Sequence, residues 1–546
     1  MSENRQIARA AGLVSALTML SRIGGLIRDA VIGYVFGTGN AADAFFVAFR
    51  LPNLMRRLVA EGAANVAFIP VFSDYLANRG TAETARAARA VGTMLVLVLL
   101  LLAVSGMVVA PMLTAVFAPG FAADPAKFAL TVALSRLVFP YLVLVGIAAL
   151  LGALLNTYRH FAAPAAASIF LNLAIIGAAL VLGPHLHIPV YSLACGVLLG
   201  GVLQVLAHVV PLRRRGVNVW PRWDPAHPAV RRVLRLMTPS LFGTAVLQIN
   251  LVVNTIMASV LPSGSVSYLW YASRVFEFPL GLFSVALGTA ALPSFATQAA
   301  RGAYGELRDS LSFAIRLSTL IAVPATAGLL CLATPITAVL FERGAFGPRE
   351  VTLTAQALCA LTVGLWSASV VRLLTPAFYA LHDSRTPVLI GALVFFVNLL
   401  VSLMLMGPVA ARGDSAIADL FARLSGTLNL ADLRHAGLAL GTSIAATVNV
   451  VLLVTVMRRR IEGLRLAPLL TTLGRSSLAA VVMTVPVRWL AARVDWLTPG
   501  QLLYKCAALA AAMALGIGVY AVAMLLVGGE DRRRVLSWLR ERLGRS

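Results

Sequence analysis

The feature that most constrains this chain is a series of apolar stretches, each of which could form a membrane-spanning helix. Such a helix needs about 20 mostly apolar residues. Nine stretches are strongly apolar, namely 91–116, 138–155, 169–182, 190–210, 317–340, 388–406, 436–456, 478–490 and 507–527. Five more are interrupted by polar residues, namely 11–35, 41–59, 241–261, 266–292 and 353–380. The sequence therefore predicts an all-α polytopic membrane protein with about 14 transmembrane helices.

Composition leads to the same class of protein. Only 12% of the 546 residues are charged, and 59% are hydrophobic. Soluble domains carry about 25% charged residues, so this chain could not cover a water-exposed surface. The four cysteines lie far apart and form no CxxC pair, which excludes a disulfide scaffold or a zinc ribbon. The first apolar stretch runs on too far for a signal peptide, so we expect a retained first helix.

Loop charges predict the orientation of the spans. The net charge of +23 comes almost entirely from arginine. Arginines gather after even-numbered spans and in the C-terminal tail, whereas the loops after odd-numbered spans are short or mixed in charge. Because basic loops stay on the cytoplasmic side, both termini are expected in the cytoplasm. This explanation of the basic charge is preferred to nucleic-acid binding, which we do not expect.

An internal duplication divides the chain. Arg50 and Arg274 lie 224 residues apart within similar segments, and Phe117 and Phe341 repeat the same offset. Six spans separate the copies, so both enter the membrane in one orientation, as in carriers built from two parallel lobes. The sequence predicts an N-lobe over 1–230, a C-lobe over 231–470, and two extra helices with a basic cytoplasmic tail over 471–546.

Several arginines fall inside the interrupted spans, where a charge costs a few kcal/mol and usually faces a polar cavity or a partner. The alternative is that these side chains extend to the interface or pair for structural reasons. We favour that alternative for Arg57, Arg136 and Arg372. We favour a functional role for Arg22, Arg28, Arg56 and Arg274.

The chemistry of these arginines indicates the substrate. Guanidinium groups bind phosphate and carboxylate through paired hydrogen bonds, which predicts an anionic ligand such as a phosphate or pyrophosphate. No GxxxxGK[ST], GxSxG or HExxH motif occurs, and the histidines do not form a ligand cluster. The sequence therefore favours a carrier over an ATPase, a hydrolase or a metalloprotease, and predicts no cofactor or metal.

Three segments carry a family resemblance. They are SRIGGLIRDAVIGYVFGTGNAADAFFVAFRLPNLMRRLVAEGAANVAFIPVF, SGSVSYLWYASRVFEFPLGLFSVALGTAALPS and LLTPAFYALHDSRTP. With them the chain closely resembles the MurJ (MviN) family of bacterial lipid II flippases over nearly its whole length. The resemblance implies the MOP exporter fold, with two six-helix lobes around a cationic cavity. It also implies a groove on the last two helices for a polyprenyl tail, and a place in the bacterial inner membrane.

The resemblance also assigns roles to residues. The cavity arginines that bind the head group correspond to Arg22, Arg28 and Arg274, with Arg56 nearby. Gate and support residues correspond to Ser21, Asp29, Asp43, Asn53, Glu61, Ser267 and Glu277, of which Ser21 and Asn53 are also expected to contact substrate. The implied partners are lipid II and membrane lipids, and the cell-division and elongation machinery is a further candidate.

Two departures from the family pattern bear on mechanism. Many relatives have an acid directly before the span-eight arginine, where this chain has Ser273, so a gating ion pair that needs that acid is in doubt. Span seven offers Gln248, Asn250 and Asn254 but no carboxylate, so a sodium site built on a span-seven acid is not expected. A coupling ion or the membrane potential is expected to drive transport.

The rival functions come from different classes. Another MOP-type carrier, either an O-antigen-unit flippase or a drug antiporter, is the nearest. A drug antiporter handles cations and should hold an excess of intramembrane acids, whereas arginines prevail here. An enzyme acting on polyprenyl phosphates would need paired carboxylates or metal ligands on one face. A structural scaffold of the division machinery would have no reason to keep arginines in the bilayer.

Overall fold

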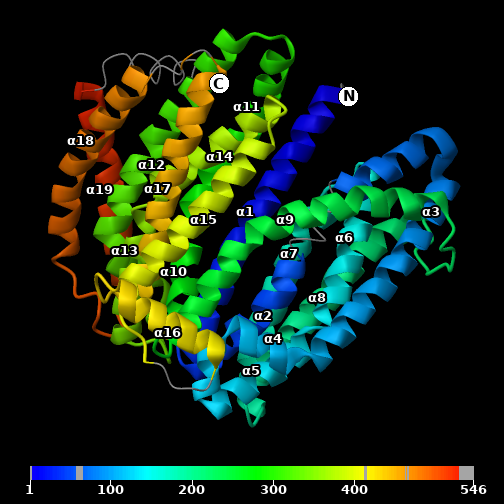
Figure 1. Ribbon diagram of the computed structural model, residues 1–546, viewed down its shortest axis with the longest axis horizontal. Coiled ribbons are helices and arrows are strands. Elements are labelled where there is room, and N and C mark those ends of the chain that lie inside the picture. Colours follow the sequence, from blue (N-terminus) through cyan, green and yellow to red (C-terminus); the bar gives the residue numbers. More distant parts are fainter. Residues whose placement is uncertain (1–2, 57–65, 411–414, 462, 464–465, 528–546) are drawn as a thin grey trace. The chain divides into compact units, whose positions relative to one another are not determined.

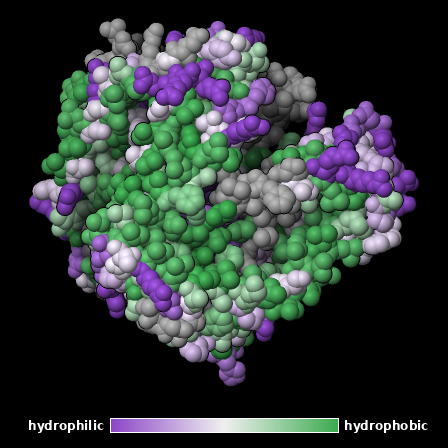
Figure 2. Space-filling view, in the orientation of Figure 1, coloured by the Kyte–Doolittle hydropathy of each residue, from purple (hydrophilic) through white to green (hydrophobic). Residues whose placement is uncertain are grey.

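The computed structural model describes residues 3–56, 66–410, 415–461, 463 and 466–527 (Figure 1). Within these ranges the regular structure is helical, apart from isolated bridges between Arg343 and Phe346 and between Met406 and Asp432. This confirms the predicted all-α class. Figure 2 shows hydrophobic residues along the flanks of the helices and hydrophilic residues at their ends, as expected for helices surrounded by lipid.

The chain divides into two compact units. Unit 1 comprises Met1–Ser267 and Ala411–Leu420. Its helices are α1 (Glu3–Phe36), α2 (Asn40–Arg56), α3 (Ile69–Val108), α4 (Ala110–Phe117), α5 (Pro125–Val138), α6 (Tyr141–Thr157), α7 (Ala162–Gly177), α8 (Tyr191–Arg214), α9 (Pro228–Val260) and the start of α10 (Ser265–Pro279).

Unit 2 comprises Tyr268–Ala410 and Phe421–Ser546. After α10, its elements are the π-helical turn η5 (Leu280–Ser284), α11 (Val285–Ala300), α12 (Tyr304–Phe341), α13 (Pro348–Thr362), α14 (Leu365–Ala380), α15 (Arg385–Leu405), α17 (Arg434–Arg460), α18 (Leu466–Ala491) and α19 (Leu502–Val527). Helix α16 (Ala416–Leu428) contributes to both units. The predicted boundaries at 230 and 470 stay predictions.

The predicted count of 14 spans is not confirmed. In the described ranges ten helices are long and apolar enough to cross a membrane, or eleven if α13 and α14, bent by 46°, form one span. The predicted spans 11–35, 41–59 and 241–261 are not among them. They coincide with α1, α2 and α9, each of which includes or borders residues outside the described part of the chain, so these three spans stay predictions.

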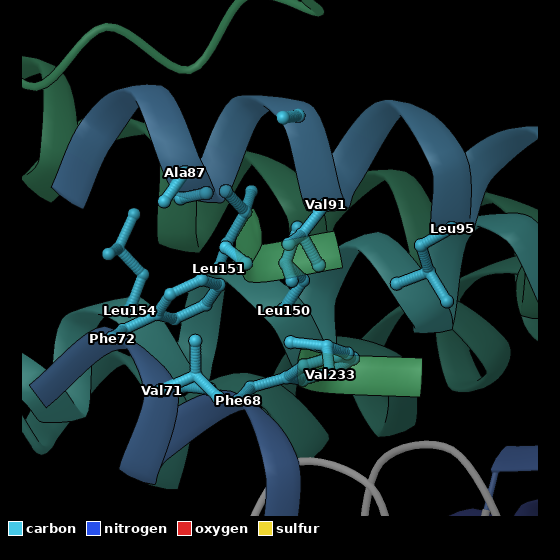
Figure 3. Packing of buried hydrophobic residues seen from close by; sticks show 14 of the residues in the cluster. Phe68, Val71, Phe72, Ala87, Val91, Leu95, Leu150, Leu151, Leu154 and Val233 are labelled. Atoms are coloured by element: carbon cyan, nitrogen blue, oxygen red, sulfur yellow. The ribbon is translucent and has the colours of Figure 1, made fainter. Parts of the chain in front are cut away.

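The core of unit 1 forms where α3, α6, α8 and α9 meet. Figure 3 shows Phe68 and Phe72 packing beneath Leu150 and Leu154, with Val233 of α9 beside them. Helices α7 and α8 approach so closely that a Cβ on Gly200 would lie 2.9 Å from the Cα of Leu171. Small residues permit such backbone contact between helices in a membrane, where apolar burial from water contributes little.

The core of unit 2 gathers residues from α11, α12, α14 and α17, including Phe295, Leu311 and Phe378. The last two helices pack against this unit through α12. The Tyr520 hydroxyl of α19 donates to the Leu320 carbonyl at 3.0 Å and lies 2.7 Å from the Ser476 hydroxyl of α18. The helix pair predicted as an addition to the repeats is therefore tied to α12 by polar contacts as well as by packing.

Candidate substrate-binding site

The best-defined part of the site lies on α1, where Arg28 is held by its neighbour Asp29. Arg28 Nε and Nη2 donate to Asp29 Oδ1 at 3.0 and 2.7 Å. The Asp29 side chain is fully buried and that of Arg28 is 11% exposed. A charge in such surroundings is tolerated when it is both paired and hydrogen-bonded. Asp29, predicted as a support residue, thus compensates the charge of Arg28.

A residue that the sequence analysis missed completes this arrangement. Asn172, from the middle of the apolar helix α7, is 5% exposed. Its Oδ1 accepts from Arg28 Nη1 at 3.2 Å, and its Nδ2 donates to the Ser21 carbonyl at 3.0 Å. A Cβ added at Gly24 would lie 3.4 Å from this Nδ2, so the glycine leaves room for the amide against α1. The only local signal was an amide inside the run IFLNLAII.

Arg22 lies on the same helix and differs from Arg28. Its side chain is half-buried, and in the described part of the chain no hydrogen-bond or ion-pair partner of its guanidinium is found. Six residues separate it from Arg28, which corresponds to about 9 Å along the helix axis and about a third of a turn around it. One guanidinium is therefore fixed by protein groups, and the other keeps its donors available.

A second group of predicted residues meets at the start of α2, and we call it the Asp43 cluster (Asp43, Lys127, Gly264 and Ser267). Asp43 Oδ1 accepts from the backbone N–H and the hydroxyl of Ser267 at 3.0 and 2.6 Å. Asp43 Oδ2 accepts from Lys127 Nζ at 2.7 Å and from Gly264 N at 2.8 Å. Asp43 and Ser267 are 224 residues apart, which equals the offset of the predicted duplication.

Local structure places Lys127 in this cluster. Asp124 caps α5 by accepting from the backbone N–H groups of Ala126 and Lys127 at 3.1 and 3.0 Å, and Pro125 occupies the first turn. Pro in that position has the backbone angle that a helix needs. The ammonium then lies 4.1 Å from the centre of the Phe121 ring, besides its contact with Asp43. The sequence analysis did not predict this lysine as a site residue.

The remaining predicted residues of the first repeat lie near the end of α2. Asn53 is half-buried, one residue after a proline within the helix. Arg50, one turn earlier, donates from Nη1 to the Thr255 hydroxyl of α9. Arg56 is the last residue of α2, and its side chain lies outside the described part of the structure, as does Glu61.

In unit 2, Arg274 and Glu277 form an ion pair on α10. Arg274 Nη1 donates to Glu277 Oε2 at 3.1 Å, with side chains 26% and 46% exposed, and the guanidinium carbon lies 4.5 Å from the centre of the Trp270 ring. Ser273, where the family resemblance led us to expect an acid, donates to the Trp270 carbonyl at 2.7 Å. The carboxylate that faces Arg274 thus comes from the next turn of its own helix.

The structure therefore brings the predicted residues together in three separate groups. Ser21, Arg28 and Asp29 meet at Asn172. Asp43 and Ser267 meet at Lys127, and Arg274 meets Glu277. The roles of these residues in transport stay predictions.

Known proteins resemble this chain over most of its length. The family model described as "Lipid II flippase MurJ" matches residues 32–506. The lipid II flippase MurJ of Burkholderia cenocepacia is 36% identical over 517 residues, covering 94% of this chain and 96% of that protein. A probable lipid II flippase MurJ of Vibrio cholerae is 35% identical, with 96% and 97% covered.

Solved structures share the fold. A lipid II flippase MurJ in an inward closed conformation matches with a TM-score of 0.75 and 23% identity, covering 94% of this chain and 98% of that one. An inward-facing multidrug resistance MATE transporter of the MOP superfamily matches with a TM-score of 0.64 and 15% identity, covering 83% and 98%. The fold predicted from the resemblance is confirmed. With a family model matched over most of its length and full-length relatives above 30% identity, this chain belongs to the lipid II flippase MurJ family.

Proposed function

We propose that this chain moves lipid II from the cytoplasmic to the periplasmic leaflet of the bacterial inner membrane by alternating access, with both termini in the cytoplasm. The observation that carries the proposal is the arginine arrangement on α1. Arg28 is buried and held by Asp29 and Asn172, while Arg22 has no described partner. Family membership supports the same assignment, because the curated relatives are named lipid II flippases.

Physical chemistry links these arginines to a pyrophosphate. An arginine in the centre of a span costs about 3 kcal/mol by insertion scales, and this cost is offset where the charge meets an anion or water. Guanidinium groups match phosphate oxygens through two parallel hydrogen bonds. Asp29 offsets part of the charge of Arg28, whereas Arg22 retains its full charge for a ligand. A doubly charged diphosphate would supply the missing negative charge.

The apolar tail of such a lipid requires a different surface. A long hydrocarbon chain cannot follow its head group among arginines without large desolvation losses. Helix α18 exposes Val481 and Val485, and α19 exposes Ile517 and Leu526, each by at least 61%. We propose that these faces carry the polyprenyl chain while the head group crosses.

A drug antiporter is the alternative with most support from the fold, since MATE transporters share it. Intramembrane arginines do not suit cationic drugs, so we favour the flippase, a carrier rather than an enzyme. Coupling to an ion or to the membrane potential, and an association with the cell-division and elongation machinery, stay predictions.

Complementation with a lipid assay tests the flippase. Cells depleted of their own lipid II flippase would express Arg22→Ala, Arg28→Ala or Arg274→Ala, and lipid II reaching the periplasmic face would be measured with an impermeant probe. We expect normal membrane levels with loss of surface lipid II, because each variant removes a phosphate ligand. Arg28→Lys keeps the charge but loses the two parallel hydrogen bonds that a guanidinium can make, so we expect a partial loss of surface lipid II. Normal surface lipid II in all three alanine variants would contradict the proposal.

Photocrosslinking tests the proposed tail surface separately. A photoreactive residue would replace Val485 of α18 or, as the control, Leu101 of α3, since both are 68% exposed. We expect adducts with a labelled polyprenyl lipid to form preferentially at 485. Equal labelling at both positions would mean that α18 has no special role in tail binding.

A further inference from the structure

The connection between α8 and α9 exposes two tryptophans. In this segment, residues 215–227, which we call the Trp loop, Trp220 is 65% exposed and Trp223 is 70% exposed. An indole is among the largest apolar groups in a protein, and leaving two of them three residues apart in water is unfavourable. Their exposure indicates a surface that meets something other than bulk water.

The exposure is not a result of a loosely attached loop. Arg89 Nε of α3 donates to the Trp220 carbonyl at 2.7 Å, and the backbone N–H of Arg222 donates to the Thr93 hydroxyl at 2.8 Å. Val217, at the start of the loop, is buried in the core of unit 1. The backbone between the tryptophans is thus attached to α3, and the indoles point outward from a fixed position.

Two markers place the Trp loop at a membrane–water boundary. The membrane-spanning helix α8 ends at Arg214, directly before the loop. On α3, the attachment residues Arg89 and Thr93 flank the position where the long apolar run begins. Indoles concentrate at this level of membrane proteins because the ring is apolar and its N–H is polar.

The net charge around the indoles is positive, and Asp224 is the acid within the loop. Exposed arginines flank the loop on both sides and occur within it, namely Arg213, Arg214, Arg215, Arg222 and Arg231. The Arg213 guanidinium carbon lies 5.6 Å from the centre of the Trp220 ring. The acids that α3 contributes here, Asp74 and Glu83, already pair with Arg232 and Arg86. Figure 2 shows hydrophilic residues gathered at this end of α3.

We propose that the Trp loop is a docking surface for the head groups of anionic phospholipids in the cytoplasmic leaflet. The indoles of Trp220 and Trp223 insert at the level of the glycerol backbone, and the flanking arginines bind the lipid phosphates. Each basic residue close to an anionic leaflet contributes measurably to binding, and the guanidinium fork suits a phosphate. The surface would anchor unit 1 at this boundary whether or not lipid II is the transported molecule, and it rests on the proposed function only for its cytoplasmic orientation.

Native mass spectrometry of the full-length protein in detergent tests the proposal. The protein would be titrated with phosphatidylglycerol and, separately, with phosphatidylcholine of the same acyl chains. For Arg222→Gln we expect about fivefold weaker binding of the first phosphatidylglycerol, the equivalent of about 1 kcal/mol, with phosphatidylcholine unchanged. The backbone N–H that bonds Thr93 remains in this variant, so the loop should keep its fold. Arg222→Lys should restore most of the binding.

A tryptophan pair of variants and a matched control complete the design. Trp220→Ala with Trp223→Ala should weaken binding of both lipids, because the indoles contact the region that the lipids share. Trp489→Ala on α18, where Trp489 is 57% exposed and lies 3.9 Å from the Arg493 guanidinium, should leave phosphatidylglycerol binding unchanged. Wild-type lipid binding in Arg222→Gln and in the tryptophan variant would overturn the proposal. The same variants would also be titrated with soluble polyglutamate. If they lost polyglutamate binding but kept lipid binding, the Trp loop would be a protein-docking surface instead.

Discussion

Replacing Asn172 by alanine should separate the positioning of Arg28 from the stability of the fold. The substitution removes the acceptor for Arg28 Nη1 and the donor to the Ser21 carbonyl. A hydrogen bond to a charged group contributes about 1.5–3 kcal/mol and a neutral one about 0.5–1.5 kcal/mol, so the loss should be about 2–4 kcal/mol. Arg28 would then be held by Asp29 alone, which is adjacent in sequence and cannot orient the guanidinium across to α7.

The assay compares thermal unfolding in detergent with transport in depleted cells. Asn398→Ala on α15 is the matched control, because that asparagine is also in an apolar helix and is fully buried. Both variants should unfold at a lower temperature, but only Asn172→Ala should reduce surface lipid II, by about tenfold or more. If Asn172→Ala transports as well as Asn398→Ala, the amide is a packing residue and the positioning argument is wrong.

Two further predictions concern topology and the Asp43 cluster. A cysteine at the exposed Gly39 should react with an impermeant maleimide from outside the cell, and one at Arg214 should not. The reason is that the loop charges place the C-terminal end of α8 in the cytoplasm. The opposite labelling would reverse the topology. Lys127→Met should lower the free energy of unfolding by about 3–5 kcal/mol, because it leaves the Asp43 carboxylate buried without its counter-ion. Adding Asp43→Asn should recover much of this loss in a thermal unfolding assay. If the effects of the two substitutions were additive, the pair would not be coupled.

Sequence patterns predicted the helical class, the strongly apolar spans and the arginines on α1 because these are local signals. Contacts between distant segments left no such signal. Asn172 meets Arg28 across 144 residues, and Lys127 meets Asp43 across 84. Arg274 and Glu277 were both predicted as site residues, and the structure adds that they pair with each other along α10.

One compositional signal was available and points to buried lysines. Lys127 and Lys505 are the only lysines among 45 basic residues, and both are buried in ion pairs. Lys505 Nζ donates to Glu342 Oε2 at 2.6 Å and to the carbonyls of Trp496 and Thr498 at 2.9 and 2.7 Å, so all three of its donors are used. The positive charge of Lys505 lies in the first turn of α19, and the negative charge of Glu342 lies just after the last residue of α12. A helix dipole disfavours a cation at the N-terminus and an anion at the C-terminus, so each of these two charges needs the other.

A guanidinium could not replace this ammonium. It has five donors in a rigid plane, and the pocket, where both side chains are 4% exposed, offers four acceptor atoms, namely the two carbonyls and both carboxylate oxygens of Glu342, so at least one donor would lack a partner. Each buried donor without a partner costs about 1–3 kcal/mol, so Lys505→Arg should destabilise the protein by at least about 1 kcal/mol although it keeps the charge. Lys505→Arg should therefore lower the unfolding temperature of the protein in detergent. Equal unfolding temperatures for Lys505→Arg and the unmodified protein would show that the pocket accepts either cation, and that the use of lysine here has no basis in hydrogen-bond geometry.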